Sequence, residues 1–522
     1  MSIGDTDFHG LDVARPIVIT ATLGNLPDSL KDLDVYGEYL RGYDAASGHI
    51  EDEPREDLET VLTVRLRIEG DLEPSWSLYS ERAEQQGLER SLRWQDRKAI
   101  APARVGTYAI GNLSWTRGSV LNRLTDERAN LGVELARAAR NARASFGAQA
   151  ADQLADALRV VTDTANNLGV PVGAAAQALL DAHAVSIGDG AIALHSESGI
   201  PLRLLGTGSA RLLIAGLQRA AAEAATIVLI DEVEYGLEPH RLVRLLDSLG
   251  AKDRSPPLQV FMTSHSPVAL RELSGGQVFI TRASAAGHSV QKAGTDDDVQ
   301  SLLRRDPEAF LAKSVLVCEG ASEVGLARGL DQFWAAQGDR SFSSLGGAYV
   351  DVGGGNPDRC LDRALSLLRL GYRVLVLLDA DKPWNKQRAE SLEQAGGHLL
   401  TWRDQRSLED ELFLSLADEG VGILLARACD AVGRDEVSQH IQSRSNGRRS
   451  LDDVEREGSL AGYSEATRRL LGQASRMRNN GWFKSVSKCE ALGREVVGPS
   501  LDKADVGFVA IIERLRAWSR AS

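Results

Sequence analysis

The sequence predicts an α/β protein in which short buried parallel strands alternate with helices. The main observation is a set of short apolar runs, each followed by a helical pattern, at residues 227–230, 258–262, 314–318 and 374–378. Such runs are typical of strands that are covered on both faces of a parallel sheet. The length of 522 residues allows about three domains, at roughly 150 residues each.

The composition is that of a globular protein, with 43% hydrophobic and 25% charged residues. No apolar run approaches the ~20 residues of a membrane span, and the N-terminus has no signal peptide, so we expect no membrane partner. A net charge of −13 argues against non-specific coating of nucleic acid. The cysteines have no C-x-x-C spacing, which favours a reducing cytoplasm over disulfides or a zinc site: Cys318, Cys360, Cys429 and Cys489.

Carboxylates follow two of the apolar runs directly. Glu319 follows the run 314–318, with Glu323 one helical turn later, and Asp379 and Asp381 follow the run 374–378. Because the carboxyl ends of parallel strands meet at one edge of a sheet, we expect these acids to converge. Converging acids repel unless a divalent cation neutralises them, and oxygen-only ligands suit Mg²⁺ or Mn²⁺. For either motif alone, solvated acids at a strand end are the commoner explanation.

Together, and in this order, the two motifs resemble the Toprim domain of topoisomerases, primases and OLD-family nucleases. Residues 349–356 (YVDVGGGN) supply the middle strand and Gly-rich turn of that domain. The resemblance covers roughly residues 314–416. It implies a Rossmann-like parallel sheet in a Toprim nuclease domain at residues 311–420.

Two later segments add to this resemblance. Ser407 is a plausible N-cap with acids in the first turn of its helix. In OLD-family nucleases a similar segment carries a metal-binding acid, for which Glu409 is the better match, with Glu411 beside it. The resemblance also makes Lys484, in GWFK, the lysine at the scissile phosphate. For Glu409 and Glu411 the alternative is an ordinary charged helix start. For Lys484 it is a surface lysine beside a buried aromatic pair.

A second group of motifs precedes the first, in the order GTGSAR, VLIDEVEYGLEPH and TSHSP. Four apolar residues before Asp231 and Glu232 form the layout of a Walker B strand, in which the first acid holds Mg²⁺ and the second orients the attacking water. His265 ends the next strand, where it could sense a γ-phosphate. The small residues 206–209 leave backbone N–H groups free for a phosphate at a helix start. Taken singly, an apolar strand followed by Asp-Glu is often only a strand capped by acids, and a histidine such as His265 is often an ordinary loop residue.

The ordered set resembles ABC-type ATPases of the SMC, RecF and OLD kind. Carried over by motif, the signature turn is Gly206, Gly208, Ser209 and Arg211, the Walker B pair is Asp231 and Glu232, and the switch histidine is His265. We expect this ATPase domain at residues 1–300, with strands at 17–22, 62–68 and 76–79. Its helical insertion, at about 121–187, either packs on the domain or serves as a dimerisation arm.

One ATPase element is missing, because no G-x-x-x-x-G-K-[ST] occurs in the 522 residues. Two explanations compete. We favour a start that is internal to a longer gene, and the other is a degenerate ATPase that binds nucleotide poorly or not at all. ATP is therefore a conditional cofactor.

Residues 421–522 are expected to form a helical region that completes the nuclease site and ends in an amphipathic helix at 506–518. One stretch of it is basic and free of acids. It forms either a solvated helix face or a strip that follows phosphates. Its basic residues are Arg468, Arg469, Arg476, Arg478, Lys484 and Lys488.

An ABC-like ATPase followed by Toprim resembles the OLD nucleases, whose class includes the nuclease subunit of Gabija-type antiphage systems. The resemblance implies two-metal cleavage of DNA under nucleotide control, in antiphage defence or DNA repair, by a dimer or higher homo-oligomer, with a helicase as a candidate partner. Two alternatives remain. A topoisomerase-like enzyme needs a tyrosine in a recognisable partner domain, and a non-catalytic nucleotide-sensing RecF-type repair protein needs only the first domain.

Overall fold

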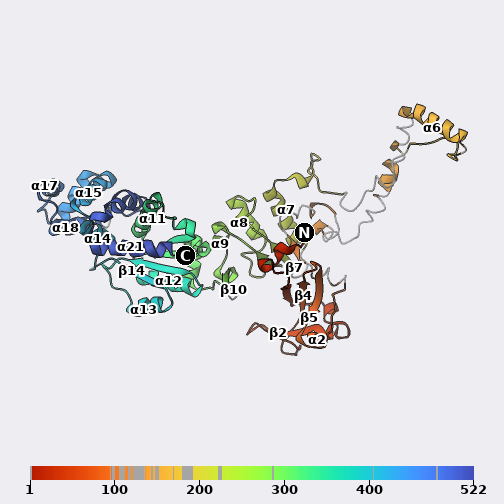
Figure 1. The fold of residues 1–522 in the computed structure, drawn as a ribbon, viewed down its shortest axis with the longest axis horizontal. Helices are drawn as coiled ribbons and strands as arrows, with labels where there is room; N and C mark the ends of the chain where they lie inside the picture. Colours follow the sequence, from red (N-terminus) through yellow and green to blue (C-terminus); the bar gives the residue numbers. More distant parts are fainter. Residues whose placement is uncertain are drawn as a thin grey trace. The chain divides into compact units, whose positions relative to one another are not determined.

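The computed structural model describes residues 3–93, short stretches between residues 96 and 178, and residues 192–521 except 222–225, 285–286, 404, 478 and 479. The chain forms two compact units, Met1–Ser264 and His265–Ser522 (Figure 1). Contacts thus place residues 265–300 with the second unit. The domain limits inferred from the sequence at 300, 311 and 420 stay predictions.

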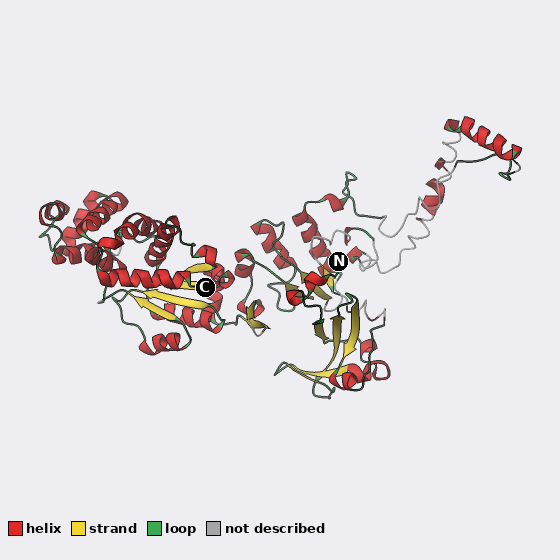
Figure 2. Ribbon diagram, viewed as in Figure 1, coloured by secondary structure: helices red, strands yellow, loops and turns green. Residues whose placement is uncertain are grey.

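The first unit begins with an antiparallel sheet (Figure 2). Its central strand is β4, which pairs with β1 along one edge and with β2 and β5 along the other. The three alternating segments predicted from the sequence lie in β1, β4 and β5. The elements are β1 (Ile17–Leu23), α1 (Leu33–Tyr36), β2 (Leu40–Asp44), β3 (His49–Glu51), β4 (Glu59–Ile68), β5 (Pro74–Tyr79) and α2 (Glu81–Gln85).

A small parallel sheet of order β6-β7-β8 follows in the same unit. Two of its strands, β7 (Thr226–Ile230) and β8 (Leu258–Met262), are the apolar runs expected at 227–230 and 258–262. The other elements are β6 (Ala103–Arg104), α7 (Thr207–Ala220) and α8 (Pro239–Ser248). Parts of the insertion expected at 121–187, among them residues 122–134, 147–151 and 179–187, lie outside the described residues, and α6 (Ala155–Asn167) is a helix described within it.

The second unit is built on a four-stranded parallel sheet of order β12-β11-β13-β14. Its strands are β11 (Ser314–Cys318), β12 (Gly347–Asp351), β13 (Arg373–Leu378) and β14 (His398–Thr401). Leu316 lies beside Tyr349 on one side and Leu375 on the other. All five residues of β11 are buried, as expected for a strand that is covered on both faces.

Helices cover both faces of this sheet. Leu316 and Leu375 pack in one core with α11 (Ala321–Ala336) and α21 (Val506–Arg520), while α12 (Asp358–Arg369) packs on the other face (Figure 1). The remaining elements before the helical region are α9 (Pro267–Glu272), the hairpin β9 (Phe279–Ser284) and β10 (Gly287–Lys292), α10 (Asp297–Arg305) and α13 (Lys386–Gln394). The closing helix predicted at 506–518 is confirmed as α21.

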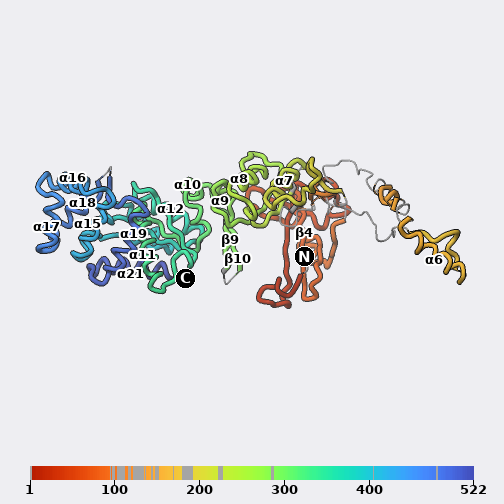
Figure 3. Tube along the Cα trace, turned by 90° about the horizontal axis from the view of Figure 1, so that it is seen from above, coloured from red at the N-terminus to blue at the C-terminus, as the bar shows by residue number. Residues whose placement is uncertain are grey.

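The C-terminal region is helical, as predicted, and α15 to α18 form one group (Figure 3). Its helices are α14 (Leu408–Ser415), α15 (Asp418–Val432), α16 (Arg434–Arg444), α17 (Leu451–Ala461), α18 (Glu465–Ser475), α19 (Val486–Leu492) and α20 (Gly498–Ser500), with a π-helical turn at Gly493–Val497. No helix of the described chain is long and apolar enough to cross a membrane.

Two glycines of α11 let α19 approach its backbone. A Cβ on Gly325 would overlap the carbonyl oxygen of Val486, and a Cβ on Gly329 would overlap the carbonyl oxygen of Glu490. The chain just before α19 carries Lys484, and the first turn of α11 carries Glu323. This close packing therefore sets how these two residues lie relative to one another.

We expect Gly329→Ala to destabilise the second unit by about 1–3 kcal/mol, because the new methyl group meets backbone that cannot rotate away. Denaturant unfolding measures this change. The matched control is Gly216→Ala in α7, where nothing lies within 4 Å of the added Cβ. There alanine should be neutral or should stabilise by about 0.5–1 kcal/mol, because glycine costs more conformational entropy in a helix. Equal effects of the two substitutions would contradict the packing argument.

Candidate functional site

The parallel register brings the two strand-end motifs together. Cys318 pairs with Leu377, so Glu319 and Asp379 leave neighbouring strands at the same edge of the sheet. The N–H of Glu319 donates to the carbonyl oxygen of Leu377 at 3.3 Å. Glu319 is only 5% exposed, so its carboxylate is held inside the edge rather than in solvent.

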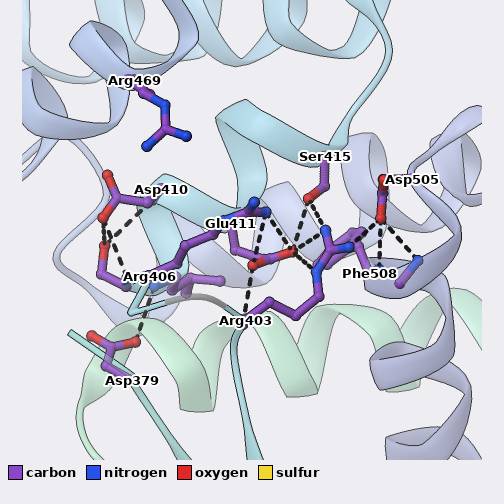
Figure 4. Close-up of polar contacts among 12 residues, drawn as sticks. Asp379, Arg403, Arg406, Asp410, Glu411, Ser415, Arg469, Asp505 and Phe508 are labelled. Atoms are coloured by element: carbon purple, nitrogen blue, oxygen red, sulfur yellow. Dashed lines mark hydrogen bonds and ion pairs between the residues drawn. The ribbon is translucent and has the colours of Figure 1, made fainter. Parts of the chain in front are cut away.

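Glu323 and Asp379 are anchored by backbone N–H groups. Glu323 Oε2 accepts from the N–H of Gly320 at 2.9 Å, which is the return toward Glu319 that the sequence predicts. Asp379 Oδ1 accepts from the N–H of Leu408 at 3.0 Å (Figure 4). Because Leu408 begins α14, this bond ties the start of α14 to the sheet edge.

Glu409 joins these acids from α14. The Ser407 hydroxyl caps the helix by accepting from the N–H of Asp410, as its sequence suggests. Glu409 is 5% exposed. Burial raises the pKa of Glu409, while the ammonium of Lys484 and the guanidinium of Arg476 act in the opposite direction. Lys484 is itself exposed.

Burial and neighbouring acids raise the pKa values of Glu323 and Asp379. Burial, then Glu409 and Glu319, raises the pKa of Glu323 to about 8. Burial and the charges of Glu323, Glu409, Glu319 and Asp381 raise the pKa of Asp379 well above its usual value. The cluster therefore favours neutralisation, by protons or by cations.

Two basic side chains contact the cluster. Lys382 Nζ lies 2.8 Å from Glu319 Oε1, and Arg476 bridges Asp381 and Asp410 at 3.2 and 3.0 Å. Lys382 was not among the residues predicted from the sequence, although it stands directly after Asp381. The second oxygen of Glu319, Oε2, is buried and has no hydrogen-bond partner.

These residues fit a hard divalent cation in donor chemistry. They offer oxygen ligands alone, one buried carboxylate oxygen is unpartnered, and two acids resist ionisation without a counter-charge. Within the described ranges, no three His, Cys, Asp or Glu side chains are already gathered closely enough to hold a metal ion. Binding would therefore require side-chain movement, first of all at Lys382 and Arg476.

Glu411 does not belong to this cluster. Its fully buried carboxylate accepts from Arg403 at 2.7 Å and from the Ser415 hydroxyl at 2.8 Å, and pairs with Arg406 at 3.4 Å (Figure 4). These partners hold it within the protein, so we remove Glu411 from the predicted metal ligands. Its neighbour Glu409 stays in the set.

The arginines of the predicted basic strip have structural partners. Arg468 donates to the carbonyl oxygens of Phe413 and Leu416 and pairs with Asp418, and Arg469 pairs with Glu465. Arg476 is held by the acids described above. These three arginines therefore do not form a free phosphate strip. Arg478 lies outside the described residues, and Lys484 and Lys488 are not part of these pairs.

In the first unit the predicted Walker B acids follow β7 directly. Asp231 and Glu232 are both exposed there. The Thr263 hydroxyl donates to Asp231 Oδ1 at 2.6 Å and accepts from the N–H of Glu232 at 2.8 Å. Glu232 has φ of 46°, a conformation that is uncommon for a residue other than glycine. Thr263 thus links the two strand ends, a role that the sequence did not reveal.

The buried side chain of Arg211 contacts the backbone of the loop that carries Asp231 and Glu232. It is 2% exposed and donates to the carbonyl oxygens of Asp231 at 3.4 Å, Glu232 at 3.2 Å and Tyr235 at 2.6 Å. Burial lowers the pKa of Arg211. Arg211 therefore positions the Asp231–Glu232 loop, and its place in the signature turn of an ATPase stays a prediction.

The other residues of the predicted signature turn lie around the start of α7. Gly206 is the exposed N-cap, and Ser209 Oγ accepts from Arg241 at 2.9 Å. A Cβ on Gly208 would lie 2.7 Å from the Gly236 carbonyl oxygen, so this glycine is required by packing. His265 is exposed and begins the second unit, and its role as switch histidine stays a prediction.

Comparisons with known proteins bear on both units. Residues 37–271 match the model of a family described as "AAA domain, putative AbiEii toxin, Type IV TA system". Comparison with curated proteins gives no match. One similar solved structure is the C-terminal region of the OLD protein of Xanthomonas campestris pv. campestris, with 16% sequence identity and a TM-score of 0.23, covering 41% of this chain and 96% of that one. Residues 37–271 are therefore similar to an AAA domain, and this range contains the motifs from which an ATPase domain is predicted.

Proposed function

We propose that the protein is a divalent-metal-dependent endonuclease that hydrolyses DNA phosphodiester bonds at the acid cluster of its second unit. The observation that carries this proposal is the buried, unpartnered Oε2 of Glu319, beside Glu323 and Asp379, whose pKa values are raised by burial and by the acids around them. Burying such groups costs stability unless a ligand compensates them. Acids arranged in this way therefore indicate a functional site.

The proposed ligands of two Mg²⁺ or Mn²⁺ ions are Glu319, Glu323, Asp379, Asp381 and Glu409. When bound, such ions supply an activated water and charge neutralisation at the leaving oxygen. The N–H groups of Gly320 and Leu408 orient the carboxylates of Glu323 and Asp379. Lys484, exposed beside Glu409, would place positive charge at the phosphate oxygens.

We further propose that nucleotide in the AAA domain controls cleavage. The exposed Asp231 and Glu232 at the end of β7 support this, because such acids hold Mg²⁺ and orient water in phosphoryl transfer. The description of the matching family names a putative toxin of a type IV toxin–antitoxin system, which favours a role in defence. DNA as substrate, a homo-oligomeric state, a helicase partner and a cytoplasmic location belong to the same proposal.

The test is cleavage of supercoiled plasmid in the presence of Mn²⁺. We expect Asp379→Ala to lower the rate by about 100-fold or more, because a cation ligand is lost. The matched control, Asp502→Ala, removes an exposed acid of the same unit and should cleave like the wild type. EDTA should abolish cleavage by both active proteins.

Equal nicking by the wild type and Asp379→Ala would contradict the assignment. A covalent protein–DNA adduct trapped during the reaction would favour the topoisomerase-like alternative. Mn²⁺ binding that is unchanged in Asp379→Ala would favour the RecF-type alternative, in which the acids have no catalytic role.

A further inference from the structure

The ammonium of Lys382 has two hydrogen-bond partners at the edge of the acid cluster. Its ammonium donates to Glu319 Oε1 at 2.8 Å and to the carbonyl oxygen of Gly355 at 3.1 Å. Gly355 ends a run of three glycines with positive φ, which aims this carbonyl at the lysine. The lysine thus has one charged and one neutral acceptor.

The two partners differ strongly in exposure. The side chain of Lys382 is 46% exposed, whereas that of Glu319 is 7% exposed. A lysine can leave such a pair by rotating its flexible stem into solvent, but the glutamate cannot. Departure of Lys382 would leave Glu319 without a cationic partner, since its other oxygen has no hydrogen-bond partner.

We propose that Lys382 competes with the divalent cation for the carboxylate of Glu319, so that cation binding releases the ammonium toward a phosphate of the DNA backbone. This inference rests on the proposed nuclease function and adds a residue that the function did not require. A divalent cation and an ammonium on one buried carboxylate repel each other, so one displaces the other. The released ammonium remains tethered next to Asp381, at the rim of the same site.

A hydrated ammonium on a flexible stem suits a phosphate oxygen as well as a carboxylate. Exchange of Lys382 from Glu319 to DNA would therefore link cation binding to substrate binding. Each ligand would favour the other, because both require Lys382 to leave Glu319.

The test measures Mn²⁺ affinity by isothermal titration calorimetry on the full chain. We expect Lys382→Met to bind Mn²⁺ at least about fivefold more tightly than the wild type, because the competitor is removed. Lys382→Arg keeps the charge and should bind like the wild type. Lys386→Met, a neighbouring exposed lysine on α13, is the matched control and should change the affinity little.

Folding is checked in the same proteins by thermal unfolding. In EDTA, Lys382→Met should have a lower Tm than the wild type, since the acids lose a counter-charge, and it should gain more Tm on addition of Mn²⁺. A folded Lys382→Met protein that binds Mn²⁺ no more tightly than the wild type would overturn the competition. If the wild type itself binds no Mn²⁺, the proposed nuclease function fails as well.

The DNA contact has its own readout. With Ca²⁺ in place of Mn²⁺, DNA affinity of Lys382→Met should fall, and the slope of log K against log salt should decrease by about one. Unchanged DNA affinity together with tighter Mn²⁺ binding would retain the competition and overturn the phosphate contact.

Discussion

Replacing Glu323 by glutamine should lower Mn²⁺-dependent DNA cleavage by about 100-fold or more while making the protein more stable. Glu323 is 4% exposed and lies among other acids. Glutamine has nearly the same shape, and its amide oxygen can still accept from the N–H of Gly320. The substitution therefore removes the negative charge and preserves the cap of α11.

The gain in stability has a defined pH dependence. Burial, Glu409 and Glu319 raise the pKa of Glu323 to about 8, above its usual value of 4.5. Between these two values the unfolded chain releases a proton that the folded chain retains, so wild-type stability falls as pH rises. The advantage of Glu323→Gln should therefore be small below pH 4.5 and reach about 1–3 kcal/mol near pH 8.

Denaturant unfolding in EDTA at pH 5 and pH 8 measures this difference, and plasmid cleavage measures the activity. Glu393→Gln on α13 is the matched control, since that glutamate is exposed, and neither quantity should change. A fully active Glu323→Gln would remove Glu323 from the proposed ligands. Lower stability at pH 8 would contradict the repulsion within the cluster.

The second large effect is expected for Arg211→Ala in the first unit. Arg211 donates to carbonyl oxygens of Asp231, Glu232 and Tyr235 from a position that is 2% exposed. Alanine leaves these oxygens without their donor and creates a cavity beneath the loop. We expect a loss of about 2–4 kcal/mol in unfolding free energy.

The same substitution should weaken Mg²⁺-dependent nucleotide binding, measured with a fluorescent ATP analogue. The strained φ of 46° at Glu232 depends on the surrounding contacts, and Arg211 supplies two of them. Arg244→Ala on α8 removes an exposed arginine and should affect neither property. If Arg211→Ala lost nucleotide binding at unchanged stability, direct contact with nucleotide would replace the positioning role.

Much of the fold was accessible from local pattern. The runs 314–318 and 374–378 became β11 and β13, and the runs 227–230 and 258–262 became β7 and β8. The prediction that such runs are covered on both faces holds for β11 and β13, whereas β7 and β8 keep exposed side chains, among them Leu229 and Phe261. The convergence of Glu319 and Asp379 follows from the same rule, since the ends of parallel strands share an edge.

The local sequence pattern did not predict which charged residues pair with one another. Glu409 and Glu411 are two positions apart, yet Glu409 joins the acid cluster while Arg403 and Arg406 enclose Glu411. Arg476 reaches Asp381 from 95 residues away. Such pairs depend on which helices pack together, and no local period encodes that.

The sequence by itself thus determined which residues stand at the ends of the strands, because the length of an apolar run and the alternation of its side chains are local properties. The tertiary structure alone decided which of those charges are neutralised and by what. It pairs Lys382 with Glu319 and Arg476 with Asp381, and it brings Arg211 to the carbonyl oxygen of Asp231. The physical reason is that desolvation and Coulomb energy depend on the full three-dimensional surroundings of a charge, to which distant segments contribute as much as neighbours do.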